Sequence, residues 1–141
     1  MGIINIIVEG VPQPGGSKRG IYSKRLNRVL IFDDAKGNKD WRATVAAFAR
    51  EAYKGEPLTG PLSVTMVFTM PRLKSHCNKK GLRLDAPSLH SKKPDVLKLA
   101  RSTEDALTGI AWVDDAQIAD EHISKFYGDT PGAIISIEEL E

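Results

Sequence analysis

Alternating apolar and polar positions mark the expected strands of this chain. Between residues 62 and 70, apolar side chains alternate with Ser63, Thr65 and Thr69, which predicts a strand with one buried face. Residues 3–8 are apolar and β-branched, which is typical of a buried strand. A hairpin is expected from strands 21–24 and 28–32, with its turn near 26–27. Three further short strands are expected at 110–113, in part of 117–127, and at 133–137.

Two segments have the period of an amphipathic helix. From Asn38 to Lys54, apolar residues are spaced by four, three and four positions, and Gly55 follows; this stripe is Trp41, Val45, Phe48 and Ala52. A second helix is expected from about Pro94 to Thr108, with Gly109 after its end and with Val96, Leu99, Ala100, Thr103 and Leu107 facing the core. We therefore predict an α+β fold, with a mixed, mostly antiparallel sheet and two main helices in one domain over residues 1–141.

The composition is that of an ordinary globular protein and excludes several classes. Hydrophobic residues make up 41% of the chain, and no apolar run approaches the ~18–20 residues of a membrane-spanning helix. The first ten residues lack the basic and long apolar regions of a signal peptide. Cys77 is the single cysteine, and it forms no zinc-site spacing with the three histidines. We expect a cytoplasmic protein without a membrane partner and without structural zinc.

Charge is distributed unevenly although the net charge is only +2. Lys125 is the one basic residue after position 101, where more than half of the 18 acidic residues lie. Basic residues gather in segments 18–28 and 72–93, which predicts either a surface that follows DNA phosphates or two solvated loops. We expect His76 and His90, in the second segment, to be surface residues. The expected DNA contacts are Lys18, Arg19, Lys24, Arg25, Lys74, Lys79, Lys80, Lys92 and Lys93.

Acidic residues before and after the second helix carry the candidate chemistry. Asp95 lies at its start, while Asp114 and Asp115 follow segment 110–113, where a strand end is expected. Carboxylates that meet from separate elements suit Mg²⁺ or Mn²⁺, which can activate water and stabilise charge on a phosphate. The alternative is structural, with Asp95 capping its helix and the paired aspartates forming a turn. Spacing alone leaves both interpretations open.

Three spaced motifs resemble the RusA Holliday-junction resolvase family. Residues 93–95 (Lys-Pro-Asp), 105–107 (Asp-Ala-Leu) and 114–118 (Asp-Asp-Ala-Gln-Ile) follow the family pattern K-P-D-x-D-N-L-x-K-x-x-x-D-A-L and D-D-x-Q-I. Residues 10–19 and 41–42 are similar to the phage and actinobacterial branch of that family. The resemblance spans nearly the whole chain. It implies a homodimeric, Mg²⁺-dependent endonuclease, for which Mn²⁺ can substitute, that makes paired symmetric nicks across four-way DNA junctions in recombination and repair.

The resemblance also implies roles for single residues. By position, Asp95 and Asp115 match the metal-binding acids, and Asp114 stands beside them as a ligand or as the group that orients water. Arg101 stands where the family has a functional lysine. We expect Arg101 and Lys98 to stabilise charge in the transition state, although an ion pair between Arg101 and Asp105 is an equal alternative.

Leu97 departs from the family pattern, which has a second aspartate at that position. Leu97, Arg101 and Asp105 share one helix face through steps of four. We therefore expect Asp105, or failing that Glu104, to complete the metal site. The lost carboxylate also leaves a second hypothesis open, that of a junction-binding protein with weak or no catalysis. A nuclease for other branched DNA or for RNA is the third.

Overall fold

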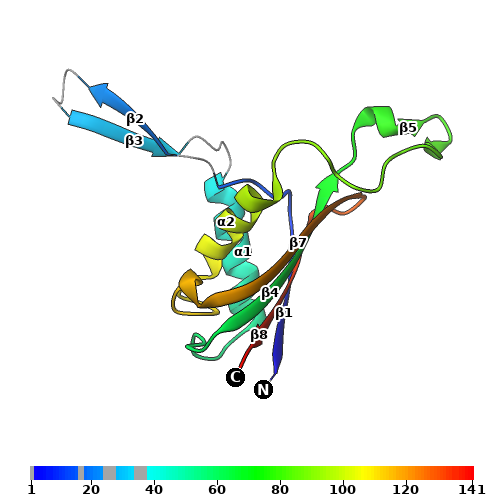
Figure 1. Cartoon of the computed structure of the whole chain (residues 1–141). Coiled ribbons are helices and arrows are strands. Elements are labelled where there is room, and N and C mark those ends of the chain that lie inside the picture. Colours follow the sequence, from blue (N-terminus) through cyan, green and yellow to red (C-terminus); the bar gives the residue numbers. More distant parts are fainter. Residues whose placement is uncertain (1, 16–17, 24–27, 34–37) are drawn as a thin grey trace.

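A computed structural model describes residues 2–15, 18–23, 28–33 and 38–141, with side chains for 2–15 and 41–141 (Figure 1). Two helices cover one face of a four-stranded sheet, and two small hairpins project from the molecule. The α+β class with two helices and a mixed sheet is confirmed. The elements are β1 (Ile3–Glu9), β2 (Lys18–Ser23), β3 (Arg28–Asp33), α1 (Asn38–Ala52), β4 (Leu62–Pro71), η1 (Lys74–His76), β5 (Cys77–Asn78), β6 (Gly81–Leu82), α2 (Val96–Leu107), η2 (Asp115–Gln117), β7 (Ile118–Gly128) and β8 (Gly132–Glu139).

The sheet has the strand order β1-β8-β4-β7. β8 is antiparallel to both β1 and β4, while β4 and β7 are parallel. The alternation expected for β4 is confirmed, because Val64, Met66 and Phe68 are fully buried on the face that the helices cover. No helix of the described residues covers the opposite face (Figure 1), and Ile7 and Ile134 on it are 65% and 50% exposed.

The expected hairpin is confirmed by the antiparallel pairing of β2 with β3, and its turn at 26–27 lies outside the described residues.

β1 confirms the strand expected at 3–8, but only every second side chain is buried. Ile3 and Ile7 are 59% and 65% exposed, whereas Ile6 and Val8 are buried. β1 is an edge strand covered on one face only, so the expectation of full burial is wrong.

Both helices form where the apolar period predicts them. In α1 the buried stripe runs through Trp41, Val45 and Ala49; Ala52 is exposed, because the helix ends there beyond the core. In α2, Leu99, Ala100, Thr103 and Leu107 are buried as expected. A hydrogen bond joins the two helices, since Trp41 Nε1 donates to Thr103 Oγ1 at 3.1 Å.

The expected strand at 110–113 is wrong, because these residues form a turn that follows α2. The backbone nitrogens of Ile110 and Ala111 donate to the carbonyl oxygen of Leu107, at 3.0 and 2.9 Å, and Gly109 adopts φ +90°. Trp112 is fully buried, and its Nε1 donates to Thr108 Oγ1 at 3.0 Å. A short apolar run can be buried in a turn as well as in a strand, so its sequence could not separate the two. Within the part of the chain that the structure describes, no helix has the length and hydropathy to cross a membrane.

We expect Thr103→Val to lower the free energy of unfolding by about 1–3 kcal/mol. Valine keeps the side-chain volume but leaves the buried indole N–H of Trp41 without its acceptor. Thr65→Val, on the open face of the sheet, is the matched control and should change it by no more than about 0.5 kcal/mol. Urea unfolding of both variants checks this; equal midpoints would show that the bond contributes nothing.

Candidate functional site

Helix α2 separates the acidic residues that the sequence singles out. Asp95 is the residue before the first turn of α2, and Asp105 lies in its last turn. At a rise of ~1.5 Å per residue, their Cα atoms lie about 15 Å apart. Asp115 is the first residue of η2 and Asp114 is the N-cap before it; Asp105 is close enough for its charge to act on Asp115. The structure therefore brings Asp105, Asp114 and Asp115 together at one end of α2 and places Asp95 at the other.

A concentration of negative charge marks the carboxyl-terminal end of α2. Burial, followed by interaction with Asp114 and Asp105, raises the pKa of Asp115 above its usual range. The pKa of Glu104 rises to about 8, first because of burial and then because of a hydrogen bond with Glu121 and repulsion from Glu121, Asp115 and Asp105. We call these residues the acidic group: Glu104, Asp105, Asp114, Asp115 and Glu121.

The candidate site also includes Glu121 and Lys125, which the sequence motifs did not indicate. Both lie on the side of β7 that faces the helices, in the same row as Ile123 and the buried Tyr127. Glu121 points toward Glu104, and its Oε2 atom is buried without a hydrogen-bond partner. The signal that could have found them is a pair of ionisable residues at the apolar phase of an alternating strand.

Asp114 and Gln117 hold the turn that precedes β7. Asp114 Oδ1 accepts a hydrogen bond from the backbone nitrogen of Ala116 at 2.9 Å. Gln117 Oε1 accepts from the nitrogens of Val113 and Asp114, and its Nε2 donates to the carbonyl oxygens of Leu58 and Gly60. The expected turn role of Asp114 is therefore present in the structure. The expectation that the pair lies at the end of a strand is wrong, because η2 leads into β7 instead.

Asp95 lies before α2 but does not cap it, since its carboxylate makes no capping hydrogen bond. Its Oδ1 lies 3.9 Å from Lys98 Nζ, and both side chains are exposed. Lys125 Nζ donates to the carbonyl oxygens of Lys92 and Pro94, at 2.6 and 2.7 Å. Burial lowers the pKa of Lys125, and Asp95 acts against that shift. Lys125 thus holds the chain on both sides of Lys93, immediately before Asp95.

The outward side of α2 lies between the two ends and is open to solvent. Leu97 is 71% exposed, and Arg101 and Asp105 are exposed as well. Among the described residues, Arg101 forms no ion pair with Asp105, so the expected alternative of such a pair is not found there. The loop before β2 crosses this helix, where Gly15 N donates to Lys98 O at 2.7 Å.

Mg²⁺ and Mn²⁺ prefer oxygen ligands, above all carboxylates. Every side chain of the acidic group ends in a carboxyl group. Glu121 Oε2 is buried without a hydrogen-bond partner, and burial together with the neighbouring carboxylates raises the pKa of Glu104 to about 8, so a second negative charge beside Glu121 is disfavoured there. Over residues 2–15 and 41–141, no three His, Cys, Asp or Glu side chains are already arranged to ligate one ion. The chemistry of the acidic group therefore fits a divalent cation, while the complete ligand set is not assembled within the described part of this chain.

Segment 72–93 forms a projection that we call the arm. Its base is held by Tyr127, whose ring centroid lies 4.6 Å from that of His76 and 4.8 Å from that of His90. The expectation that both histidines lie on the surface is wrong, because they are only 8% and 9% exposed. Backbone hydrogen bonds join the returning side of the arm to β7, from Tyr127 N to Ser88 O at 2.8 Å and from His90 N to Lys125 O at 3.2 Å.

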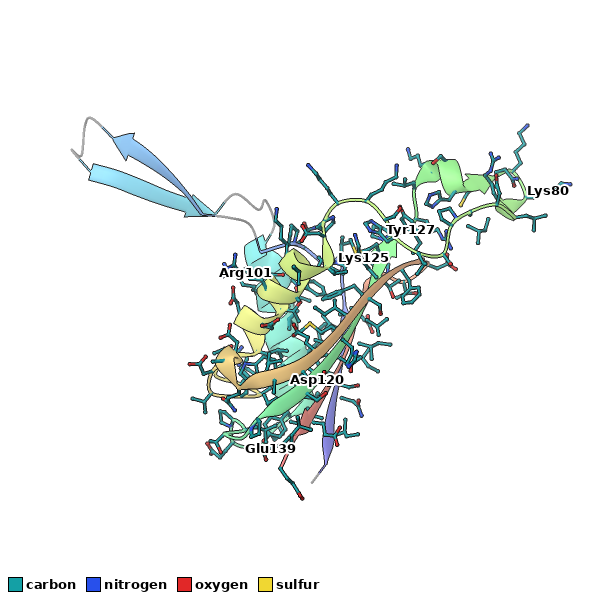
Figure 2. All side chains as sticks on the ribbon, in the orientation of Figure 1. Lys80, Arg101, Asp120, Lys125, Tyr127 and Glu139 are labelled. Atoms are coloured by element: carbon teal, nitrogen blue, oxygen red, sulfur yellow. The ribbon has the colours of Figure 1, made fainter. Side chains whose placement is uncertain are left out.

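The arm carries the described part of the expected DNA surface. Lys74, Lys79, Lys80, Lys92 and Lys93 are all exposed on it, and Figure 2 shows Lys80 at its far end. Lys18 and Arg19 lie in β2, where only the backbone is described, and Lys24 and Arg25 lie outside the described residues. The hairpin β2–β3 and the arm project from the end of the molecule at which α2 begins (Figure 1). Basic residues thus lie at one end of α2 and the acidic group at the other.

The pKa of Glu104 predicts a loss of stability as the pH rises from about 4.5 to about 8. In this range the folded chain keeps a proton on Glu104 that the unfolded chain releases, so folding becomes less favourable with rising pH. Glu104→Gln should remove this decline in Tm, and Mg²⁺ added at pH 8 should raise the Tm of the wild type more than that of the variant. Glu51→Gln, on the exposed surface of α1, is the control. Parallel Tm curves for wild type and Glu104→Gln would contradict the prediction.

Two comparisons with known proteins concern the chain as a whole. Residues 12–138 match the family described as Endodeoxyribonuclease RusA. The chain is also similar to the Uncharacterized protein YqaN of Bacillus subtilis (strain 168), with 33% identity over 143 residues that cover 99% of each chain. The family match extends from the loop before β2 into β8 and includes α2, the arm and the acidic group. The chain belongs to the endodeoxyribonuclease RusA family.

Proposed function

We propose that this protein is an endonuclease that cuts four-way DNA junctions by Mg²⁺-dependent hydrolysis of phosphodiester bonds. Membership of the RusA family implies a nuclease of the Holliday-junction resolvase type. The observation that carries the proposal is the acidic group at one end of α2, with exposed basic residues of the arm at the other end. Basic side chains supply affinity for the DNA backbone, and clustered carboxylates supply a place for a divalent ion.

The residues of the acidic group have distinct roles in this proposal. Asp105 and Asp115 hold the ion, with Glu104 beside them and with Asp114 fixed by its turn. When bound, Mg²⁺ or Mn²⁺ activates water and stabilises the charge that develops on the scissile phosphate. Protonated Glu104 limits the repulsion within the group until a cation arrives.

Cations on α2 bring the DNA backbone to the acidic group. Without them the carboxylates would repel a phosphate. Arg101 and Lys98 are exposed along the helix between its two ends, and the guanidinium of Arg101 presents a planar fork that suits two phosphate oxygens. Lys125 is a positioning residue, because it ties Lys92 and Pro94 in place before Asp95.

A homodimer would bring together what α2 keeps apart. Asp95 and Asp115 lie at opposite ends of the helix and cannot ligate one ion within a chain. A two-fold axis beside α2 would set two copies of the helix antiparallel, so that Asp95 of one copy lies near Asp115 of the second while Arg101 stays open to DNA. Leu97, which is 71% exposed, provides apolar surface at the edge of such a contact. The same symmetry presents two sites to a four-way junction, which itself has near two-fold symmetry.

The competing function is a junction-binding protein without nuclease activity. The observation in its favour is Leu97, which puts an apolar side chain where the family pattern has a carboxylate. In the proposal for an active enzyme, Asp105 compensates for this loss from the same side of the helix.

Cleavage of an end-labelled four-way junction tests the proposed activity. We expect symmetric nicks that require Mg²⁺ or Mn²⁺, and we expect Asp115→Asn and Asp95→Asn each to lower the rate by about 100-fold or more, equivalent to ~2.7 kcal/mol in the barrier. Asp129→Asn, an exposed aspartate between β7 and β8, should leave the rate unchanged. Tight junction binding with no nicks in either metal would establish the binding protein instead.

Mixed dimers test whether two chains share each site. Equal amounts of Asp95→Asn and Asp115→Asn chains that exchange at random should regain about one quarter of the wild-type nicking rate, since half of the dimers then hold one intact site of two. A mixture of Asp105→Asn and Asp115→Asn is the control and should stay inactive, because both changes affect the same half of a site. An inactive first mixture, with exchange demonstrated, would place each site within one chain.

A further inference from the structure

The outer end of the arm, residues 77–85, is a structured turn that is exposed along its whole length. Cys77 pairs with Leu82 and Asn78 with Gly81 in a two-stranded ladder. Asn78 Oδ1 accepts a hydrogen bond from the nitrogen of Lys80 at 2.9 Å, and Gly81 adopts φ +110°, a conformation that favours glycine. We call this segment the tip. Its shape is maintained by its own hydrogen bonds, so its side chains are presented in a defined arrangement.

Two leucines on the tip are turned to solvent. Leu84 is 107% exposed and Leu82 is 53% exposed. Contact of apolar side chains with water is unfavourable, so a pair of leucines at the end of a projection indicates a contact surface. The base of the arm is different, because there His76 and His90 pack against Tyr127. Leu73 and Leu89, nearer the body of the protein, are also exposed, at 42% and 62%. Leu82 and Leu84 differ from them in lying on the part of the arm that extends beyond the body (Figure 1).

The charge around the leucines indicates what they contact. Lys79, Lys80 and Arg83 are exposed beside them, and the one acid of the tip, Asp85, is paired with Arg83 Nε at 3.0 Å. A basic rim favours a polyanion. The extended apolar surface that DNA offers is the face of a base pair, and this face becomes accessible where stacking is interrupted, as at a branch point.

We propose that the tip is a wedge that places Leu84, supported by Leu82, against an exposed base-pair face at the branch point of a DNA junction. This inference rests on the proposed function. Leucine is one of the apolar side chains that enter between base steps and unstack them, at a cost that new contacts offset. From the tip, the chain returns through Lys92 and Lys93 directly to Asp95, where Lys125 holds it. A wedge seated at the branch point therefore determines how far the cleaved phosphate lies from the branch.

The other conceivable occupant is a second copy of this chain. Ile7 and Ile134 are 65% and 50% exposed and lie opposite each other on the open face of the sheet. The leucines could bury themselves there, but the basic rim around them has no role in such a contact. The experiment distinguishes this outcome from the wedge.

The test compares a double variant, Leu82→Ser with Leu84→Ser, with a matched double variant of the rim, Lys79→Ser with Lys80→Ser. The full-length protein is bound in EDTA, so that no cleavage occurs, to a four-way junction that carries 2-aminopurine beside the branch point and to a linear duplex of the same sequence.

With wild type we expect the 2-aminopurine fluorescence to rise as the base unstacks. The leucine variant should lose this rise and bind the junction about tenfold more weakly, with duplex affinity within about twofold of wild type. The lysine variant should weaken both complexes alike and reduce the salt dependence by about two phosphate contacts.

A leucine variant that keeps the fluorescence rise and the junction affinity would overturn the wedge while leaving the proposed function intact. A leucine variant whose sedimentation shows a smaller assembly than wild type would also overturn it, because the leucines would then contact a second copy. If wild type itself binds the duplex as tightly as the junction, with no change in fluorescence, the proposed function fails together with the wedge.

Discussion

The packing of α2 against the helix-facing side of β7 is the constraint on which the candidate site depends. The buried residues Leu99, Thr103 and Leu107 set the rotation of the helix about its axis, so Glu104 is turned toward β7 while Asp105 is turned toward solvent. β7 runs in the opposite direction to α2. Glu121 therefore lies near the end of the helix, and Lys125 lies near its start. One strand thus contributes an acid to one end of the site and a cation to the other.

This arrangement divides the charge of the molecule into two regions about one helix length apart. In the proposed function, the cations of the arm and of the start of α2 attract DNA, and the acidic group repels it until a cation is bound. Binding of DNA and binding of metal would then support each other. In the proposed homodimer, the second copy of the chain would join the two regions without moving either of them within its own fold.

The local elements could be predicted because their signals are local. The four-residue spacing around Trp41 and Val45 and the alternation in β4 each reflect burial of one side of a regular backbone. The strand expected at 110–113 was wrong because an apolar run indicates burial and does not show whether another strand pairs with it. The surface position expected for His76 and His90 was wrong because no sequence signal shows that a histidine of a basic segment packs on an aromatic ring. Only the fold brings Tyr127 to them.

By itself, the sequence determined the class of fold and the spaced family motifs, since these depend on order and spacing along the chain. It also named Asp95, Asp105, Asp114 and Asp115 as candidate site residues. Only the tertiary structure decided which of these acids meet. Their distances depend on the length of α2 and on the direction of β7, and neither is visible in the spacing of a motif. The tertiary structure alone also added Glu121 and Lys125, because a strand residue becomes part of a site only when packing brings another element against its face.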